Sequence, residues 1–480
     1  MRINKNDLKN ELKKYINETK ISDDITLINS FKSDASLEKG TIPDLIMYPA
    51  GEDDIIRILE FANNYNIPII PSSSKEKYYG GTIPKNGGII IDLSKMNEIL
   101  EINTEDRYVW IEPGVTYEQL IPELKKHGLR IMVPLGFPPS ASVVSTYIDR
   151  VPLLTGPKIL ISEGWQCILN IHLILANGMP LDTGTASWCK ERPNFLPSGA
   201  PGGPDLSRLF SGSQGTLGIV TQLIIKAKYL PKNKKVIIAT FNNLNSCINS
   251  LNKILWYDKV REILIISKKN LSFILTGSES FKNINQIKSM CPDWLLVLGI
   301  EFDSKEKYML DLEDLKDFGV KYNESLTINK INLNEFFLRE FKLPRNLNNF
   351  RYFKDALHIP FYINGDKINN LNEGIEKIAS KYNYSLDDLL GYVMPIEQGH
   401  TYFLDYTIHY NKSEDDLKQI EQFFMEISKY LLNNGGVIDR PYGIWAELIF
   451  SNNPGLFQFL KQIKKQLDPN NILNPGRLNL

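Results

Sequence analysis

The feature that most constrains this chain is a glycine-rich stretch near its middle, residues 202–221, which reads GGPDLSRLFSGSQGTLGIVT. Its second glycine cluster, Gly212, Gly215 and Gly218, leads into the β-branched run that starts at Ile219. Glycines this close to a strand indicate bare backbone, either for a left-handed angle or for close approach by another group. A flat ring system lying on a strand edge needs such a surface. A glycine-rich hairpin is the alternative, and from the glycines alone it is favoured.

Length and composition limit the class of protein. A chain of 480 residues is expected to form two or three domains. Its 42% hydrophobic and 23% charged content is ordinary for a globular protein, and a net charge of −1 argues against nucleic acid or an anionic membrane as the main partner. No apolar run is long enough to span a bilayer, and the charged N-terminus does not resemble a secretory signal, so we expect a cytoplasmic protein.

The cysteines are few and scattered. Cys167, Cys189, Cys247 and Cys291 form no C-x-x-C pair. This spacing predicts buried or half-buried thiols in a reducing compartment, and it provides no iron–sulfur cluster.

Local patterns predict two successive α+β units. The first begins with a strand–helix–strand segment and continues with two strands and a helix; we expect these elements at 45–48, 52–64, 67–70, 89–91, 108–111 and 117–127. A second unit, 130–228, contains a Pro/Ser-rich loop at 134–146, a strand at 168–175 and the glycine-rich stretch. From about 235 to 440 strands and helices alternate, and the chain ends in a helix at 456–466 followed by LDPNNILNPGRLNL.

Four ordered blocks resemble one enzyme family. They read PDLIMYPAGEDDIIRILEFANNYNIPIIP, GGIIIDLSKMNEILEINTEDRYVWIEPGVTYEQL, GPDLSRLFSGSQGTLGIVTQ and LDPNNILNPGR, and together they span roughly residues 41–228 and 455–480. In order and separation they are similar to the FAD-dependent vanillyl-alcohol oxidase and p-cresol methylhydroxylase (PCMH) family, in the branch of the glycolate oxidase and D-lactate dehydrogenase FAD subunits. The departures in two loops, described below, make the chain resemble a divergent member of this family.

The resemblance implies an α+β fold, with a two-subdomain PCMH-type FAD-binding domain and a cap domain that has an antiparallel sheet and helices. We expect a helical lead-in over residues 1–40, the FAD-binding domain over 41–228 and the cap over 229–440. Residues 441–480 would complete the FAD-binding domain.

The resemblance also implies where FAD binds. The family's diphosphate loop corresponds to residues 71–84, but Ser72 to Lys77 replace its usual Arg-Gly-Gly-Gly-Thr-Ser, and the second loop departs as well. We therefore expect an altered lining. The implied FAD-binding residues are Ser72, Ser73, Ser74, Lys75, Glu76, Lys77, Gly80, Gly136, Ser140, Ser142, Val143, Ser145, Thr146, Gly215, Gly218, Ile219, Val220 and Asn474. Nothing in the sequence marks a covalent flavin link, so FAD is expected to be noncovalent.

Four residues are candidates for catalysis. The branch's metal-binding His-x-Gly-Asp-Gly-Asn-x-His is reduced here to a segment around His400, so we expect no catalytic metal. On a strand, His400 and Tyr402 would share one face, although core packing explains Tyr402 better. Arg440 could clamp a carboxylate and Tyr442 could donate to a phenolate or alkoxide; a structural ion pair is the alternative for Arg440.

The expected function is hydride transfer from a small hydroxy acid or related alcohol to flavin. The electrons would pass to a separate iron–sulfur protein or electron-transfer flavoprotein. One alternative is a phenol- or aromatic-alcohol-oxidising enzyme of the same family. Another, from a different class, is a flavin-free structural subunit of a redox complex, which the altered loops permit.

Overall fold

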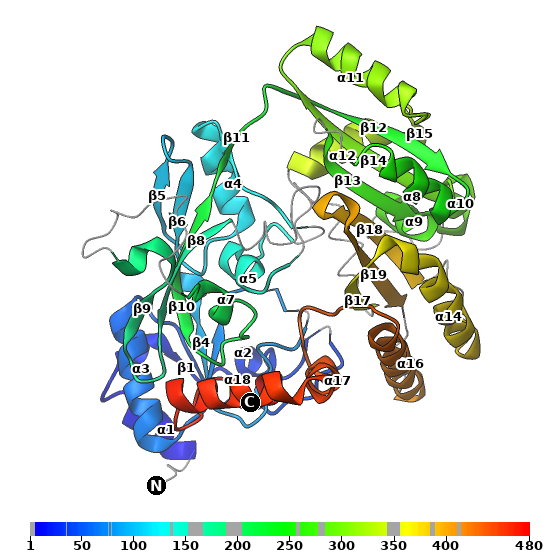
Figure 1. The fold of residues 1–480 in the computed structure, drawn as a ribbon. Coiled ribbons are helices and arrows are strands. Elements are labelled where there is room, and N and C mark those ends of the chain that lie inside the picture. The colour runs from blue at the N-terminus through cyan, green and yellow to red at the C-terminus, as the bar shows by residue number, and fades with distance from the viewer. Residues whose placement is uncertain are drawn as a thin grey trace.

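The computed structural model describes residues 5–34, 36–74, 76–77, 79–134, 138–151, 167–188, 204–255, 260–276, 284–342, 356–384, 389–409 and 414–480. Two lobes are visible: blue to mid-green chain and the red C-terminal helices form one, and green to brown chain forms the other (Figure 1). None of the helices formed by the described residues has the length and apolar character that a membrane span requires.

The first subdomain is a small, mostly parallel sheet covered by helices. Its strand order is β1-β2-β4-β3, with β1 (Ile21–Ser22) antiparallel to β2 (Leu45–Met47), and with β4 (Ile89–Asp92) and β3 (Ile69–Ser72) parallel to it. Apolar residues of α1 (Lys5–Leu12) and α3 (Glu52–Tyr65) pack on one face, and α2 (Ile25–Asn29) packs on the other. The N-terminal lead-in, expected to be helical, therefore also contributes a strand.

The expected strand at 67–70 begins two residues later than predicted. Asn66 adopts a left-handed conformation at the end of α3, and the N–H of Ile67 donates to the carbonyl of Ala62. Asn66 thus takes the left-handed position at the helix end that glycine usually occupies, and the hydrogen bond of Ile67 belongs to the end of the helix. The strand therefore starts at Ile69.

The second subdomain is an antiparallel sheet with helices on one face. Its strand order is β5-β6-β10-β8-β9, with the bounds Ile99–Asn103, Tyr108–Ile111, Ile219–Lys226, Ile168–Ile174 and Pro180–Asp182. Its core packs against α4 (Tyr117–Lys126) and α5 (Val143–Ile148), and the short α7 (Ser207–Phe210) precedes β10. A two-stranded ladder, β7 (Leu129–Arg130) with β11 (Lys228–Tyr229), lies where the chain leaves for the second lobe.

The second lobe is a six-stranded antiparallel sheet between two layers of helices, as expected for the cap. The strand order is β12-β14-β13-β18-β19-β17, with the bounds Asn233–Phe241, Trp294–Phe302, Val260–Ser267, Leu390–Ile396, Thr401–His409 and Ala356–Ile363. One face packs on α8 (Leu244–Asn252), α11 (Lys305–Asp317), α14 (Ile368–Lys381) and α16 (Glu414–Asn433). The other packs on α9 (Lys268–Thr276), α10 (Ile284–Met290) and α12 (Leu333–Lys342), and β15 (Thr327–Ile328) pairs with β16 (Ile331–Asn332).

The C-terminal segment returns to the first lobe. Helices α17 (Ile444–Asn452) and α18 (Pro454–Leu467) lie along its lower side (Figure 1). Beyond them, Leu473 bridges to Ile69 in parallel, and the N–H of Asn474 donates to the carbonyl of Ile69 at 2.8 Å. The end of the chain thus extends the edge of the first sheet beside the loop that follows β3.

Candidate active site

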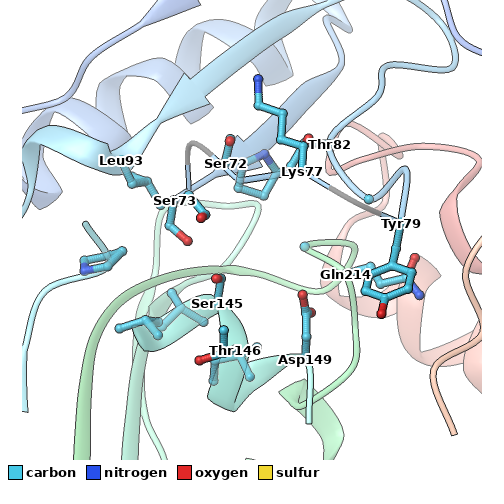
Figure 2. A pocket seen from close by; sticks show the side chains of 18 of the residues that line it. Ser72, Ser73, Lys77, Tyr79, Thr82, Leu93, Ser145, Thr146, Asp149 and Gln214 are labelled. Carbon is cyan, nitrogen blue, oxygen red and sulfur yellow. The ribbon is translucent and has the colours of Figure 1, made fainter. Parts of the chain in front are cut away.

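A cleft opens between the two subdomains of the first lobe. Its empty volume is about 1070 Å³, including the part open to solvent, which is near the upper end of the range of small-molecule and cofactor sites. It lies at the carboxyl end of the parallel strands β3 and β4, where open α/β sheets bind ligands. Hydroxyl-bearing side chains from both subdomains line it; they are Ser72, Ser73, Ser74, Thr82, Ser145, Thr146 and Ser213. Figure 2 labels five of them, Ser72, Ser73, Thr82, Ser145 and Thr146.

The upper wall in Figure 2 is the loop after β3. The Oγ of Ser74 accepts hydrogen bonds from the N–H of Glu76 and from the N–H of Ser142 across the cleft, both at 3.2 Å. The Oγ of Ser140 donates to Glu76 at 2.5 Å. Serine hydroxyls and a glutamate therefore join the two loops directly, at the positions where the sequence analysis noted that the family's usual glycines are replaced.

A lysine and an aspartate add charge to this wall. The Nζ of Lys77 lies 3.0 Å from the ring centre of Phe31, and burial lowers the pKa of Lys77 to about 8. The Asp34 carboxylate accepts a hydrogen bond from the N–H of Gly80 at 2.6 Å. In Figure 2 the Lys77 amine points away from Ser145 and Asp149 on the opposite wall.

The lower wall is the start of α5 and the loop before β10. Ser142 caps α5: its Oγ accepts from the N–H of Ser145 at 3.0 Å and donates to the carbonyl of Pro113 at 2.6 Å. Gly215 has a φ of +70°, and a Cβ there would overlap the ring of Pro71 on the opposite wall. A Cβ on Gly218 would overlap Leu173 of β8.

These features fit FAD. Gly215 leaves the space beside Pro71 open, and serine and threonine hydroxyls on both walls supply donors for a diphosphate. The residues that would line the cofactor are Ser72, Ser73, Ser74, Glu76, Lys77, Ser145, Thr146, Gly215, Gly218 and Val220.

The end of the cleft nearest the cap carries an arginine without a hydrogen-bond partner. Arg440 is 3% exposed and lines the cleft, and all three of its guanidinium nitrogens lack hydrogen-bond partners among the described residues. The Oδ1 of Asp439 lies 3.6 Å from its Nε, too far for a hydrogen bond. Burial lowers the pKa of Arg440, but Tyr79 and Asp439 raise it above its usual value, so the guanidinium stays charged.

Two tyrosines lie beside this arginine. The rings of Tyr79 and Tyr442 stack with their centres 5.2 Å apart, and the guanidinium carbon of Arg440 is 5.2 Å from the Tyr79 ring centre. The buried hydroxyl of Tyr79 and the Oε1 of Gln214 also lack hydrogen-bond partners in the described structure. A buried cation and polar atoms that gain no hydrogen bond from the protein are what a ligand with an anionic group would satisfy.

A carboxylate completes this end of the cleft. Asp149, the residue after α5, lines the cleft and interacts with Tyr442. Burial raises the pKa of Asp149 above its usual value, and Tyr442, Arg440 and Arg150 oppose that shift. The pKa of Tyr442 is raised well above 10, first by burial and then by Asp149.

The structure brings two of the four catalytic candidates to the cleft. Arg440 and Tyr442 line it. His400 does not: it lies exposed in the turn before β19, not on that strand as expected. Tyr402 is buried in the cap core, where its hydroxyl donates to Asn252.

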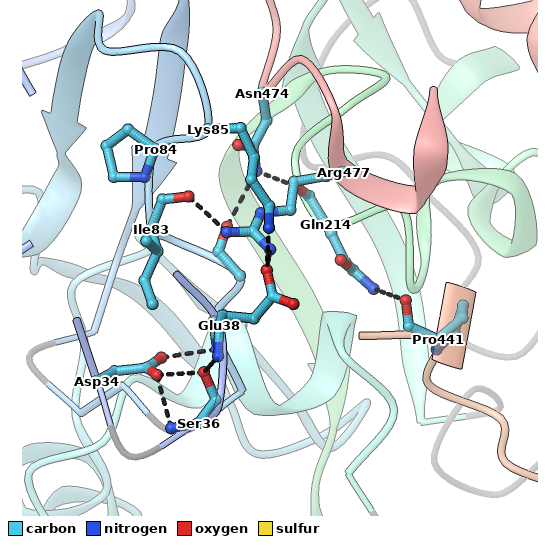
Figure 3. A network of polar contacts seen from close by, with 12 residues as sticks. Asp34, Ser36, Glu38, Ile83, Pro84, Lys85, Gln214, Pro441, Asn474 and Arg477 are labelled. Atoms are coloured by element: carbon cyan, nitrogen blue, oxygen red, sulfur yellow. Dashed lines mark hydrogen bonds and ion pairs between the residues drawn. The ribbon is translucent and has the colours of Figure 1, made fainter. Parts of the chain in front are cut away.

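The remaining implied FAD-binding residues lie behind the lining or outside the described chain. Ser140 and Ser142 form hydrogen bonds that hold the loops in place. Val143 and Ile219 are buried in the cores, and the N–H of Gly80 donates to the Asp34 carboxylate. Asn474 links the two walls from behind: its amide donates to the carbonyls of Gly81 at 3.0 Å and Gln214 at 2.7 Å (Figure 3). Lys75 and Gly136 lie outside the described residues.

The lining residues that the sequence analysis missed include four with polar side chains that bear on the chemistry, Asp34, Tyr79, Asp149 and Gln214. Two carried a usable signal. Tyr79 directly precedes the Gly80-Gly81 pair of the diphosphate loop, and Asp149 begins a charged pair, with Arg150, after an apolar helix.

Comparisons with known proteins agree with this geometry. Residues 43–183 match the family described as FAD binding domain, and residues 364–478 match the FAD linked oxidases, C-terminal domain. The glycolate oxidase subunit GlcD of Bacillus subtilis is 25% identical over 93% of this chain and 91% of its own length. The mitochondrial D-lactate dehydrogenase (cytochrome) of Arabidopsis thaliana is 23% identical over 91% of this chain and 73% of its own length.

A solved structure shows the same fold. The crystal structure of p-cresol methylhydroxylase with substrate bound superposes with a TM-score of 0.83 at 17% identity, covering 98% of this chain and 96% of the other.

Proposed function

Because the chain belongs to the FAD-dependent vanillyl-alcohol oxidase and p-cresol methylhydroxylase family, and is an FAD-dependent oxidoreductase that acts on CH–OH groups, we propose that it dehydrogenates a small 2-hydroxy acid or a related alcohol. When bound, FAD supplies the acceptor for the hydride. The residues of this chain bind the substrate, orient it and take up its proton.

One observation carries the choice of substrate class. The fork of Arg440 is buried, charged and without a hydrogen bond from the described protein, at the end of the cleft beside the cap. A guanidinium matches the two oxygens of a carboxylate with two parallel hydrogen bonds. The Tyr79 hydroxyl, which has no partner either, would add a third donor. A 2-hydroxy acid held in this way keeps its hydroxyl-bearing carbon next to its anchored carboxylate.

The stacked tyrosines favour a second candidate, a phenol or aromatic alcohol. Tyr79 and Tyr442 could hold a phenolate oxygen with Arg440 as the counter-ion, and an aromatic substrate could pack against their rings. The two candidates differ in the group that Arg440 neutralises.

We also propose noncovalent FAD and a separate electron acceptor. Among the described residues the cleft lining contains no histidine or cysteine for a flavin link. Cys167, Cys247 and Cys291 are buried, and no group of three or more potential metal ligands occurs in the described chain. An iron–sulfur protein or an electron-transfer flavoprotein would then take the electrons.

A substrate screen tests the proposal. The purified protein, loaded with FAD, is mixed without oxygen with 2-hydroxy acids and, separately, with 4-alkylphenols and benzylic alcohols, and the flavin absorbance is followed. Bleaching by a hydroxy acid supports the first candidate and bleaching by a phenol supports the second. A flavin that none of them bleaches would contradict both.

Substitution of Arg440 tests the anchor. We expect Arg440→Met to raise KM for a carboxylate substrate about 10- to 100-fold, since a hydrogen bond to a charged group is worth roughly 1.5–3 kcal/mol. Arg440→Lys keeps the positive charge but not the two parallel donors of the guanidinium, so its KM should lie between those of the wild type and Arg440→Met. FAD content and Tm should be retained, because the guanidinium makes no hydrogen bond to the described protein.

The exposed Arg107, which lies against Tyr229, gives the control. Arg107→Met should leave KM unchanged, and an unchanged KM in Arg440→Met would exclude Arg440 as the substrate anchor.

A further inference from the structure

Dehydrogenation of an alcohol needs a group that accepts the hydroxyl proton, and Asp149 is placed to be that group. Its side chain rises from the end of α5 into the cleft, on the side of Tyr79 and Gln214 (Figure 2). It interacts with Tyr442, which lines the same end of the cleft as Arg440. An acid anchored on Arg440 would therefore have its hydroxyl-bearing carbon within the reach of this pair.

We propose that Asp149 is the proton acceptor of the reaction and that Tyr442 positions it, an inference that rests on the proposed function. The C–H bond of the substrate breaks and its electron pair leaves as hydride to FAD. The O–H bond breaks and its proton moves to the Asp149 carboxylate, directly or by exchange through the Tyr442 hydroxyl. The carbon–oxygen bond becomes a carbonyl and Asp149 becomes neutral; bound FAD would take up the two electrons of the hydride.

The other carboxylates of the described lining are engaged elsewhere, Tyr442 has an unsuitable protonation state, and the Lys77 amine points away from Asp149 (Figure 2). Asp34 binds the N–H of Gly80, and Glu76 binds Ser140, so both carboxylates hold the upper loop in place. Tyr442 stays protonated because burial and Asp149 raise its pKa. The described lining contains no histidine, and His172 lies outside it between Asp182 and Glu52.

The charges around Asp149 suit a base. Arg150 follows it in the chain, and Arg440 and Tyr442 face it from the segment that returns from the cap. Tyr79 and Asp439 face Arg440 in turn. Burial raises the pKa of the carboxyl, and the two arginines oppose that shift. A base whose pKa is closer to neutrality transfers protons more effectively than an ordinary exposed carboxylate.

The test compares three variants in single-turnover flavin bleaching without oxygen, from pH 5 to 9. In the wild-type protein the rate should rise with pH as Asp149 ionises. Asp149→Asn, which keeps the shape of the side chain but cannot take up the proton, should lower the limiting rate about 100-fold or more and abolish the rising limb of the pH–rate profile. FAD content and the dissociation constant of an unreactive carboxylate analogue should stay within about threefold of wild type. Asp149→Glu should restore part of the rate.

Asp439→Asn is the matched control, because burial also raises the pKa of this carboxyl and it faces the same two arginines, yet it is not part of the described cleft lining. It should change the analogue's dissociation constant through Arg440 but keep the rising limb. The assignment would be overturned if the bleaching rate of Asp149→Asn still rose with pH as in the wild type, or if this rise were lost in Asp439→Asn instead. A wild-type flavin that no alcohol bleaches would contradict the proposed function itself, which is a separate outcome.

Discussion

At the residue scale, the cleft depends on a glycine without a side chain and on an arginine without hydrogen-bond partners among the described residues. Gly215 combines a left-handed backbone with a position where any side chain would run into Pro71 of the opposite wall. The guanidinium of Arg440 has no hydrogen-bond acceptor in the described protein, and it is therefore available to a ligand. Gly215 adopts its backbone conformation without strain, whereas Arg440 sacrifices some stability of the empty protein for a site that the substrate completes.

Substitution of Gly215 tests whether the cleft needs a residue without a side chain at this position. We expect Gly215→Ala to lower both Tm and the affinity for FAD, because the positive φ costs roughly 1–2 kcal/mol for an L-residue and the new methyl group also enters the space beside Pro71. Thermal unfolding and titration of the apoprotein with FAD measure the two effects.

Gly128 provides the comparison, since its φ is +68° and a Cβ there meets nothing within 4 Å. Gly128→Ala should show the backbone penalty alone and bind FAD normally. Equal FAD affinity in the two variants would mean that Gly215 serves only its turn.

At the element scale, the first turn of α3 joins the two subdomains. The Glu52 carboxylate accepts hydrogen bonds from Thr221 at 2.8 Å and Gln222 at 3.2 Å, both on β10. It also lies 3.0 Å from the Nε2 of His172 on β8, whose Nδ1 is 2.9 Å from Asp182 on β9. Three strands of one sheet are therefore tied to one helix of the other, behind the cleft.

This contact makes stability depend on pH. Burial lowers the pKa of His172, but the hydrogen bonds to Asp182 and Glu52 raise it above its usual 6.5 overall. A raised folded-state pKa means that the stabilisation is fully present below about pH 6.5 and is lost as the pH rises through the folded value. We expect Tm to fall over that window in the wild-type protein.

His172→Gln should remove this fall and lower Tm in acid, as thermal unfolding at several pH values would measure. The exposed His127 is the control, and His127→Gln should keep the wild-type profile. A His172→Gln profile parallel to that of the wild type would show that the ion pairs do not contribute.

At the scale of the whole molecule, the C-terminal segment fastens the cleft after the chain has built the cap. Arg477 donates to Glu38 at 2.8 Å and to the carbonyl of Ile83, while Asn474 binds both cleft loops. Gln214 donates in turn to the carbonyl of Pro441, on the segment that carries Arg440 (Figure 3). Loops of both subdomains and the return from the cap thus meet at the last residues of the chain.

Asn474→Asp tests this role with almost no change in shape. The carboxylate loses both donors and faces the carbonyls of Gly81 and Gln214. We expect Tm to fall and FAD to bind at least tenfold more weakly, equivalent to about 1.4 kcal/mol. FAD titration and thermal unfolding provide the measurements.

The exposed Asn470, whose amide donates to Asn63, serves as the reference position. Asn470→Asp should leave FAD affinity unchanged, and wild-type affinity in Asn474→Asp would show that the loops keep their positions without this link.

The sequence by itself determined the elements and the cofactor. The buried stripe of α3, the glycines before β10 and the C-terminal Asn474-Pro475-Gly476 are local patterns, set by neighbours a few residues apart. The resemblance of four such blocks led to the family, which the family matches confirm, and to the two-lobed fold, which the solved structure confirms. Even the altered diphosphate loop was visible as a run of serines.

Only the tertiary structure decided which side chains form the reacting end of the cleft. Tyr79, Asp149, Gln214 and Arg440 come from four segments up to 361 positions apart, and no local pattern encodes their mutual distances. His400 shows the converse, since its short motif suggested a site and packing left it in an exposed turn. Packing of the two subdomains and the cap, not the chemistry of any single segment, brings a charged guanidinium and a carboxylate to the same space.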